Sequence, residues 1–497
     1  MKKFDVIIVG SGLGGLECGA ILSKEGFNVC VLEKNRVLGG CLQSFKRHNK
    51  VLDTGIHYVG SMDPGQILHQ FFKYFDINDK IKTRRLDGDG FDQIHFQDKI
   101  FNYAIGYENF AETMSSYFPE EKENIYNYTK KLKEVCNLIS VDNLKKGILN
   151  IQGMDYFAQS AAKVIDHTVN NNILRNVLAG TNTLYGGVRN NSTFYHHAMI
   201  NASNIEGPHR IVDGSQAIAD ALVAKIRENG GTVLTSSQVT RFVVENNNIS
   251  SVEVNGNEII EAKHFISNLH PSVTFQLVDK TPAIKKAFLS RINSLPNSYG
   301  IFTLYLILKN NTLPYINKNI YLIKGDDVWT STTNPLDYSV RNVLLSYQSS
   351  STNPNFTEVI SVLNPMFLSE VEKWSDTSIG RRGDSYETFK QNKAQEILDF
   401  ITPYAPEIIE NIENIHTSTP LTYRDYTATP EGSAYGIIKN CNNPLVTLIP
   451  TRTKIDNLFL TGQNLNVHGA LGVTLTAAHT CAHLIGTEYL AKKIGEA

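Results

Sequence analysis

A glycine-rich run near the start of the chain, Val9-Gly10-Ser11-Gly12-Leu13-Gly14-Gly15, has the spacing of a phosphate-binding turn. It ends an apolar stretch and opens a helix-forming one. Gly10 permits a tight turn, Gly12 lets the backbone approach a pyrophosphate, and Gly15 allows close packing of helix against strand. Because helix N-termini attract anions, the phosphates are expected at the start of this helix. The run, including Gly14, predicts a dinucleotide site.

An acidic residue follows at the expected place, since Glu33 ends the next apolar strand and Lys34 comes directly after it. A carboxylate there accepts hydrogen bonds from ribose hydroxyls and favours a ribose without a phosphate. We therefore expect both residues to contact an adenosine ribose, and we exclude NADP.

A second glycine set, Gly39-Gly40, lies just beyond Glu33, and Asp53-Thr54-Gly55 comes a dozen residues later. NAD has no need of another glycine pair here. The longer FAD does, because more backbone must pass close to its flavin-side phosphate and ring. We therefore expect Gly39, Gly40, Asp53 and Gly55 to bind FAD.

The elements that must position these residues occur in three α/β stretches. Residues 4–60 read as strand, helix and strand, residues 207–285 as a helix followed by alternating strands, and residues 450–497 as a strand, a glycine-rich turn and a helix. We predict one discontinuous Rossmann-like domain built from 1–60, 207–285 and 450–497. Residues 61–206, which look largely helical, and 286–449 would form a mixed α+β substrate domain.

Composition excludes several classes of protein. With 497 residues the chain is long enough for two domains. Its 47 basic and 49 acidic side chains exclude a general nucleic-acid binder. No run of about 18 apolar residues predicts a membrane span. The six cysteines form no Cys-x-x-Cys pair, which favours a reducing cytoplasm. His479 and His483 lack a third ligand, so no metal site is predicted.

The chain resembles the superfamily of FAD-dependent amine oxidases and phytoene desaturases. The carrying residues are the glycine turn with Glu33, together with Leu458 to Gln463 and Gly469 to Leu475, which look like the closing strand and the flavin-facing helix. The resemblance implies a two-domain α/β fold and bound FAD. It also implies that four residues of the C-terminal segment contact the cofactor: Gly462, Gln463, Gly472 and Val473. The backbone of Val239 is expected to hold the adenine.

Within that superfamily the chain is most similar to the retinol saturases and carotenoid isomerases. Four segments carry this narrower resemblance: Gly39 to Phe45, Asp53 to Gly60, Thr422 to Thr427 and Thr429 to Gly436. Cys41 stands where most of the superfamily has arginine. The loss of that positive charge beside the flavin phosphates argues against the amine oxidase branch, and Cys41 is expected to contact the cofactor.

Candidate catalytic residues lie in these same segments. His57 follows the flavin-side glycine, where it contacts flavin or substrate or is satisfied by backbone partners. Tyr423, Asp425 and Glu431 occupy a loop-rich segment, and one of them is expected to donate a proton. His468 precedes the flavin-facing helix and is a further candidate.

The resemblance implies an FAD-dependent oxidoreductase that acts on carbon–carbon double bonds of an apolar polyene. A retinol-saturase-like reductase is the main hypothesis. A carotenoid desaturase or isomerase is the alternative, and a prenyl-lipid carrier of the same fold is the non-enzyme alternative. The electron donor is unidentified. Because such substrates reside in bilayers, we expect peripheral membrane contact through residues 61–206.

Overall fold

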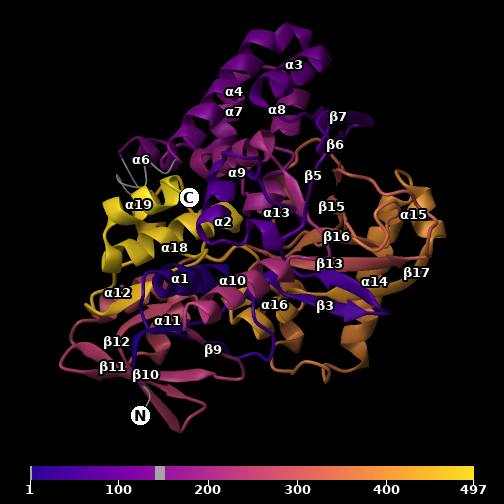
Figure 1. Cartoon of the computed structure of the whole chain (residues 1–497). Helices are drawn as coiled ribbons and strands as arrows, with labels where there is room; N and C mark the ends of the chain where they lie inside the picture. Colours follow the sequence, from indigo (N-terminus) through magenta and orange to yellow (C-terminus); the bar gives the residue numbers. More distant parts are fainter. Residues whose placement is uncertain (1–2, 140–150) are drawn as a thin grey trace.

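The computed structural model describes residues 3–139 and 151–497. Two large sheets organise the described chain, and each has seven strands. In Figure 1 the first sheet lies below, the second lies to the right, and a group of helices rises above both.

The first sheet has the order β10-β11-β12-β1-β2-β9, and β18 pairs with the end of β12. It joins segments far apart in sequence: β1 (Lys3–Val9), β2 (Val29–Leu32), β9 (Thr232–Leu234), β10 (Val239–Glu245), β11 (Asn248–Val254), β12 (Glu258–Ser267) and β18 (Leu458–Leu460). The strands β1, β2, β9, β12 and β18 run parallel. Their carboxyl ends therefore meet at one edge, where open α/β sheets bind ligands.

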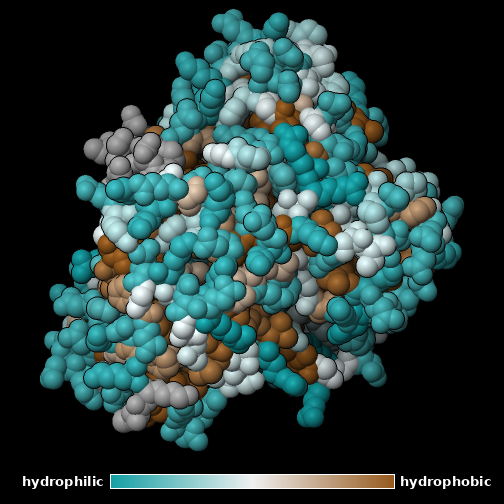
Figure 2. Space-filling view, viewed as in Figure 1, coloured by the Kyte–Doolittle hydropathy of each residue, from teal (hydrophilic) through white to brown (hydrophobic). Residues whose placement is uncertain are grey.

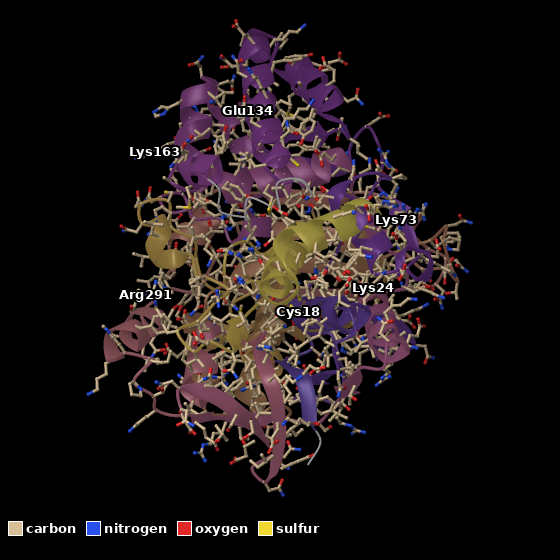
Figure 3. All side chains as sticks on the ribbon, turned by 60° about the vertical axis from the view of Figure 1, so that its left-hand side comes forward. Cys18, Lys24, Lys73, Glu134, Lys163 and Arg291 are labelled. Carbon is tan, nitrogen blue, oxygen red and sulfur yellow. The ribbon has the colours of Figure 1, made fainter. Side chains whose placement is uncertain are left out.

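Helices α1 (Leu13–Lys24), α10 (Gln216–Glu228) and α18 (Gly469–Ile485) pack on this sheet. Figure 3 labels Cys18 of α1 where the yellow α18 passes beside it. The thiol of Cys481, in α18, lies 3.8 Å from the carbonyl oxygen of Cys18. Gly19 permits close packing of α1 against α10, since a Cβ there would lie 2.8 Å from Ile226.

The second sheet is mixed, with the order β17-β13-β16-β15-β14-β6-β7. Its strands are β6 (Asp92–Phe96), β7 (Lys99–Tyr103), β13 (Gly300–Leu308), β14 (Asn319–Ile323), β15 (Asn342–Tyr347), β16 (Val359–Met366) and β17 (Ile412–Ser418). Successive side chains of β13 alternate between faces. Phe302 packs with the core residues of α14 (Asp384–Ile401), whereas Ile301 points to the opposite face, toward the first sheet.

Residues 61–206 are not as uniformly helical as the sequence predicts. They contribute β6 and β7 to the second sheet, and β5 (Thr83–Arg85) pairs with β8 (His209–Ile211). The helices of this region are α2 (Ile67–Tyr74), α3 (Tyr107–Tyr117), α4 (Lys122–Asn137), α6 (Ile151–Phe157), α7 (Ala161–Thr168), α8 (Asn172–Leu178) and α9 (Phe194–Glu206). Of these, α3, α4, α7 and α8 form the purple group at the top of Figure 1, whereas α2 lies lower, beside α18.

The remaining elements connect or flank the sheets. They are the hairpin β3 (Ser44–Arg47) and β4 (Lys50–Asp53), and the helices α11 (Pro271–Leu277), α12 (Lys286–Asn293), α13 (Thr330–Thr333), α15 (Pro406–Glu410), α16 (Pro420–Thr427), α17 (Pro444–Thr447) and α19 (Thr487–Gly495).

No helix within residues 3–139 and 151–497 combines the length and the apolar character that crossing a membrane requires. The face shown in Figure 2 is mostly hydrophilic, with hydrophobic residues in small groups. In the described part of residues 61–206, the exposed large apolar side chains are Ile100 and Tyr117. Peripheral membrane contact through this region stays a prediction.

Candidate functional site

A cavity of about 320 Å³ opens at the carboxyl edge of the first sheet. Most of the residues that the sequence assigned to a dinucleotide cofactor line it: Gly10, Gly12, Gly14, Glu33, Lys34, Gly39, Gly40, Cys41, Gly55, Val239, Gly462, Gln463 and Val473. They come from three segments that are hundreds of residues apart, and the parallel sheet brings them together. This is the arrangement expected of a dinucleotide site, and we call this space the dinucleotide cavity.

The phosphate end fits the cofactor that the resemblance implies. Gly12 is the N-cap of α1 and offers no side-chain cap, and the first turn carries no acidic residue. The N–H groups that begin the helix are therefore free to meet an anion. Gly10 has a φ of +95°, and a Cβ on Gly12 would lie 2.8 Å from the Asn268 amide. The positive φ requires glycine at Gly10, whereas a side chain at Gly12 would require the Asn268 amide to move.

Glu33 is 5% exposed and already holds the turn together. One oxygen accepts from the backbone N–H and the hydroxyl of Ser11, at 3.0 and 2.6 Å. The other accepts from the backbone N–H of Asn35 at 2.9 Å. Because a carboxylate has about four acceptor positions, one remains for a ribose hydroxyl. The sequence predicted the ribose contact and missed the internal role.

The opposite end of the cavity lies at the start of α18. His468 is its N-cap and makes no side-chain cap, and no acidic residue occupies the first turn. Gly469 and Ala470 line the cavity, so the positive end of the helix dipole faces it. Burial raises the pKa of the Cys41 thiol to about 11, which keeps this lining residue neutral at pH 7.

Three of the residues assigned to the cofactor stand behind the cavity wall. A Cβ on Gly15 would lie 2.0 Å from the carbonyl oxygen of Gly10, which is the close packing that the motif predicts. Gly472 packs on Val467 in the same manner. The carboxylate of Asp53 accepts from the Ser44 hydroxyl and the Ser215 backbone N–H, at 2.7 and 2.8 Å. Asp53 therefore braces neighbouring loops.

A second cavity, of about 140 Å³, adjoins the first. Gly55, Ile301, Leu363 and Tyr435 are among the residues that line both. The second cavity extends between the second sheet and the helical region, and most of its wall is apolar: Ile56, Val59, Leu184, Ile200, Leu344, Pro365, Ala470 and Leu471. It offers a small apolar ligand access to the inner end of the dinucleotide cavity.

His57 lines this second cavity, and neither ring nitrogen has a hydrogen-bond partner in the described protein. The interpretation in which backbone groups satisfy this histidine is therefore not supported. Burial, together with the positive charge of Arg210, lowers the pKa of His57 to about 4. At pH 7 the imidazole is neutral, with one donor and one acceptor nitrogen.

Of the other predicted acids, Tyr423 lines one of the two cavities, whereas Asp425 and Glu431 line neither. Asp425 pairs with Arg382 and Arg424 and lines neither cavity. Glu431 is exposed, with a φ of +60°. Tyr423 does line the dinucleotide cavity, but its hydroxyl donates to the carbonyl oxygen of Thr54 at 2.8 Å, and burial raises its pKa well above the usual value. That bond holds the backbone at Thr54, next to Gly55.

The remaining histidine candidates have protein partners. The Nε2 of His468 lies 3.1 Å from the Tyr185 carbonyl oxygen, and its Nδ1 has no hydrogen-bond partner in the described part of the chain. His483 pairs with Thr451 and contacts the ring of His479. Within the described ranges no three His, Cys, Asp or Glu side chains are grouped to hold a metal.

A buried polar network backs the second cavity. The Asp92 carboxylate, 1% exposed, accepts from Asn319 at 2.8 Å and from the Tyr58 hydroxyl at 2.9 Å. Arg210 donates to Asn319 and to the carbonyl oxygen of His57, at 2.9 and 3.3 Å. The network fixes the backbone at His57.

Asp92→Asn is expected to flatten the pH dependence of stability. Burial raises the pKa of Asp92 from 3.8 to about 7, so within this window the folded chain keeps a proton that the unfolded chain has lost. The free energy of unfolding therefore falls as pH rises, by up to about 1.4 kcal/mol per unit for this group. Denaturant unfolding at several pH values should show a smaller slope in the variant. The exposed control Asp98→Asn should keep the wild-type slope, and parallel curves for all three proteins would contradict the assignment.

Several lining residues escaped sequence analysis. Asn268 follows β12, donates its backbone N–H to the carbonyl oxygen of Val9 and lies close to both Gly12 and Gly462. Its position after an apolar strand was a usable signal, because ends of parallel strands gather at one edge. Tyr435 lies in the segment Thr429 to Gly436 that carries the resemblance, but no local pattern marked it as a lining residue. It reaches the site because its hydroxyl donates to the Thr183 carbonyl oxygen at 2.6 Å, from a distant segment.

Comparison with known proteins agrees with this geometry. The model of the NAD(P)-binding Rossmann-like domain matches residues 8–75. The all-trans-retinol 13,14-reductase of Danio rerio is 27% identical over 97% of this chain and 86% of its own length. The human protein of that name is 26% identical, and the chloroplastic prolycopene isomerase of Daucus carota is 24% identical over 98% of this chain and 80% of its own length.

Solved structures share the fold. Putrescine oxidase superposes with a TM-score of 0.65 at 13% identity, covering 97% of this chain and 99% of that one. An oxidoreductase from Methanosarcina mazei gives 0.62 at 16% identity, with 96% and 98% covered. These likenesses confirm the predicted fold class. Along almost its whole length, the chain is thus similar to the all-trans-retinol 13,14-reductases and the prolycopene isomerases, as its sequence predicted.

Proposed function

We propose that this protein is an FAD-dependent oxidoreductase that reduces a carbon–carbon double bond of an apolar polyene, in the manner that the name of its retinol 13,14-reductase relatives describes. The observation that carries the proposal is the junction of the two cavities. The dinucleotide cavity meets a mostly apolar one, and both are lined by Gly55, Ile301, Leu363 and Tyr435.

FAD is the proposed cofactor because the cavity provides for both of its ends. The start of α1 would hold the pyrophosphate, Glu33 a ribose hydroxyl, and the start of α18 the flavin pyrimidine. When bound and reduced, FAD supplies a hydride. The electron donor that reduces it is proposed to be external to this chain.

The chain's own residues have three tasks. The apolar walls of the second cavity exclude water and align the polyene. The side chains shared by both cavities hold the reacting bond at the cofactor's inner end. A polyene without a conjugated carbonyl must also gain a proton, so a proton source within reach is required. We propose that His57, which lies in this cavity, touches the substrate.

The test starts from the holoenzyme, which is expected to be yellow as purified. Its FAD is chemically reduced under anaerobic conditions, and the protein is then incubated with all-trans-retinol. The expected product carries two additional hydrogens by mass spectrometry. A product that is isomerised at unchanged mass would show that the protein is an isomerase, as the name of the Daucus carota relative suggests. Protein that stays colourless, with a melting temperature unmoved by added FAD, would contradict the cofactor. It would favour a carrier of the same fold, such as the Rab GDI of Plasmodium falciparum, which superposes with a TM-score of 0.53 at 13% identity over 98% of both chains.

A further inference from the structure

The wall of the second cavity contains three polar side chains with unused hydrogen-bonding capacity. Among the residues that the structure describes, neither buried ring nitrogen of His57 has a hydrogen-bond partner, and neither has the buried hydroxyl of Thr183. Asn204, only 7% exposed, makes no side-chain hydrogen bond within the described residues. The three come from separate segments: His57 from the loop after Gly55, Thr183 from the 3₁₀ helix Asn182–Tyr185, and Asn204 from helix α9.

Unpaired buried polar groups are rare, because each one costs the free energy of its lost hydration. The hydroxyls of Tyr58, Ser203 and Tyr435, which also line this cavity, are paired within the protein. Apolar residues at the three unpaired positions would therefore suit a hydrocarbon substrate better. Their convergence on one cavity is explained if a polar group of the ligand completes their hydrogen bonds. A neutral imidazole, a hydroxyl and an amide together present donors and acceptors.

Charge limits the kind of polar group. No Lys, Arg, Asp or Glu is among the described residues that line this cavity. The nearest cation, Arg210, directs its terminal nitrogens at Ser346, Asn319 and backbone oxygens behind the wall. A carboxylate in the cavity would lack a counter-ion, and burying it would be costly. A hydroxyl meets the same groups without that cost.

We infer that His57, Thr183 and Asn204 form a subsite that binds a hydroxyl at one end of the polyene and selects the alcohol over the corresponding hydrocarbon and carboxylate. The inference rests on the proposed function for the nature of the chain, and adds which end group is recognised and by which residues.

The test measures binding to the oxidised holoenzyme, so that no turnover is needed. All-trans-retinol, retinoic acid and the hydrocarbon analogue with a methyl group in place of the hydroxymethyl are titrated by ligand fluorescence. The alcohol is expected to bind at least about tenfold more tightly than either other ligand. Thr183→Val and Asn204→Leu should each weaken alcohol binding by about tenfold and leave hydrocarbon binding unchanged.

Thr183→Ser, which keeps the hydroxyl, should retain tight binding, and the exposed Thr312→Val serves as the matched control. FAD content verifies that each variant is folded. Equal affinities for the three ligands, equal losses for alcohol and hydrocarbon in the variants, or no binding at all would overturn the subsite. Selective binding of the alcohol without its reduction would instead refute the proposed reaction and leave the subsite standing.

Discussion

Gly15→Ala is expected to abolish FAD binding and to destabilise the protein by about 3 kcal/mol or more. The added Cβ would lie 2.0 Å from the carbonyl oxygen of Gly10, and this contact is with backbone that no rotamer change can relieve. The glycine turn must open, which moves the N-terminus of α1 away from the pyrophosphate position. Flavin absorbance after gel filtration and urea unfolding measure the two effects.

Gly88→Ala is the matched control, because a Cβ there meets no atom within 4 Å and its φ is not positive. Its stability should stay within about 0.5 kcal/mol of the wild type, with full FAD content. A Gly15→Ala protein that binds FAD normally would show that the turn is built differently from the one described.

Glu33→Ala is expected to weaken FAD binding by at least about tenfold. The substitution removes the acceptor proposed for the ribose, and hydrogen bonds to charged groups contribute roughly 1.5–3 kcal/mol each. It also leaves the buried N–H of Ser11 unpaired, so the turn itself loosens. Isothermal titration of the apoprotein with FAD gives the dissociation constant.

Two further variants sharpen that measurement. Glu33→Gln keeps the shape but not the charge and should fall between wild type and Glu33→Ala. Glu245→Ala, an exposed change at the end of β10 in the same sheet, should bind FAD as the wild type does. An unchanged dissociation constant in Glu33→Ala would place the adenosine end elsewhere.

The dinucleotide half of the site was predictable because its signals are local. The glycine turn and Glu33 are read from spacing within one βαβ unit, and each glycine has a backbone reason. Strand β6 was missed because it pairs with β14, more than two hundred residues away, and β7 in turn pairs with β6. Asp425 and Glu431 illustrate the converse: both have suitable chemistry, yet an ion pair with Arg382 and exposure to solvent keep them from the cavities.

The second cavity was beyond local reasoning for a related reason. Thr183 and Asn204 look unremarkable in sequence, and only the docking of the helical region against the second sheet places them beside His57. Asp92 likewise gains its unusual proton affinity from burial, which outweighs the hydrogen bonds from Asn319 and Tyr58 that lower its pKa, and no spacing pattern encodes that burial.

The place of β18 in the first sheet has a consequence for how the protein is made. Leu458–Leu460 pairs with β12, and Gly462 to Val473 completes a cavity whose first wall is Val9 to Gly14. During synthesis the opening βαβ unit leaves the ribosome more than four hundred residues before its closing partner. Until then the apolar side of α1 lacks its cover, and such exposed surface is prone to aggregation. The dinucleotide cavity is therefore completed late in maturation. A chaperone would protect the chain most while only its amino-terminal half has been made.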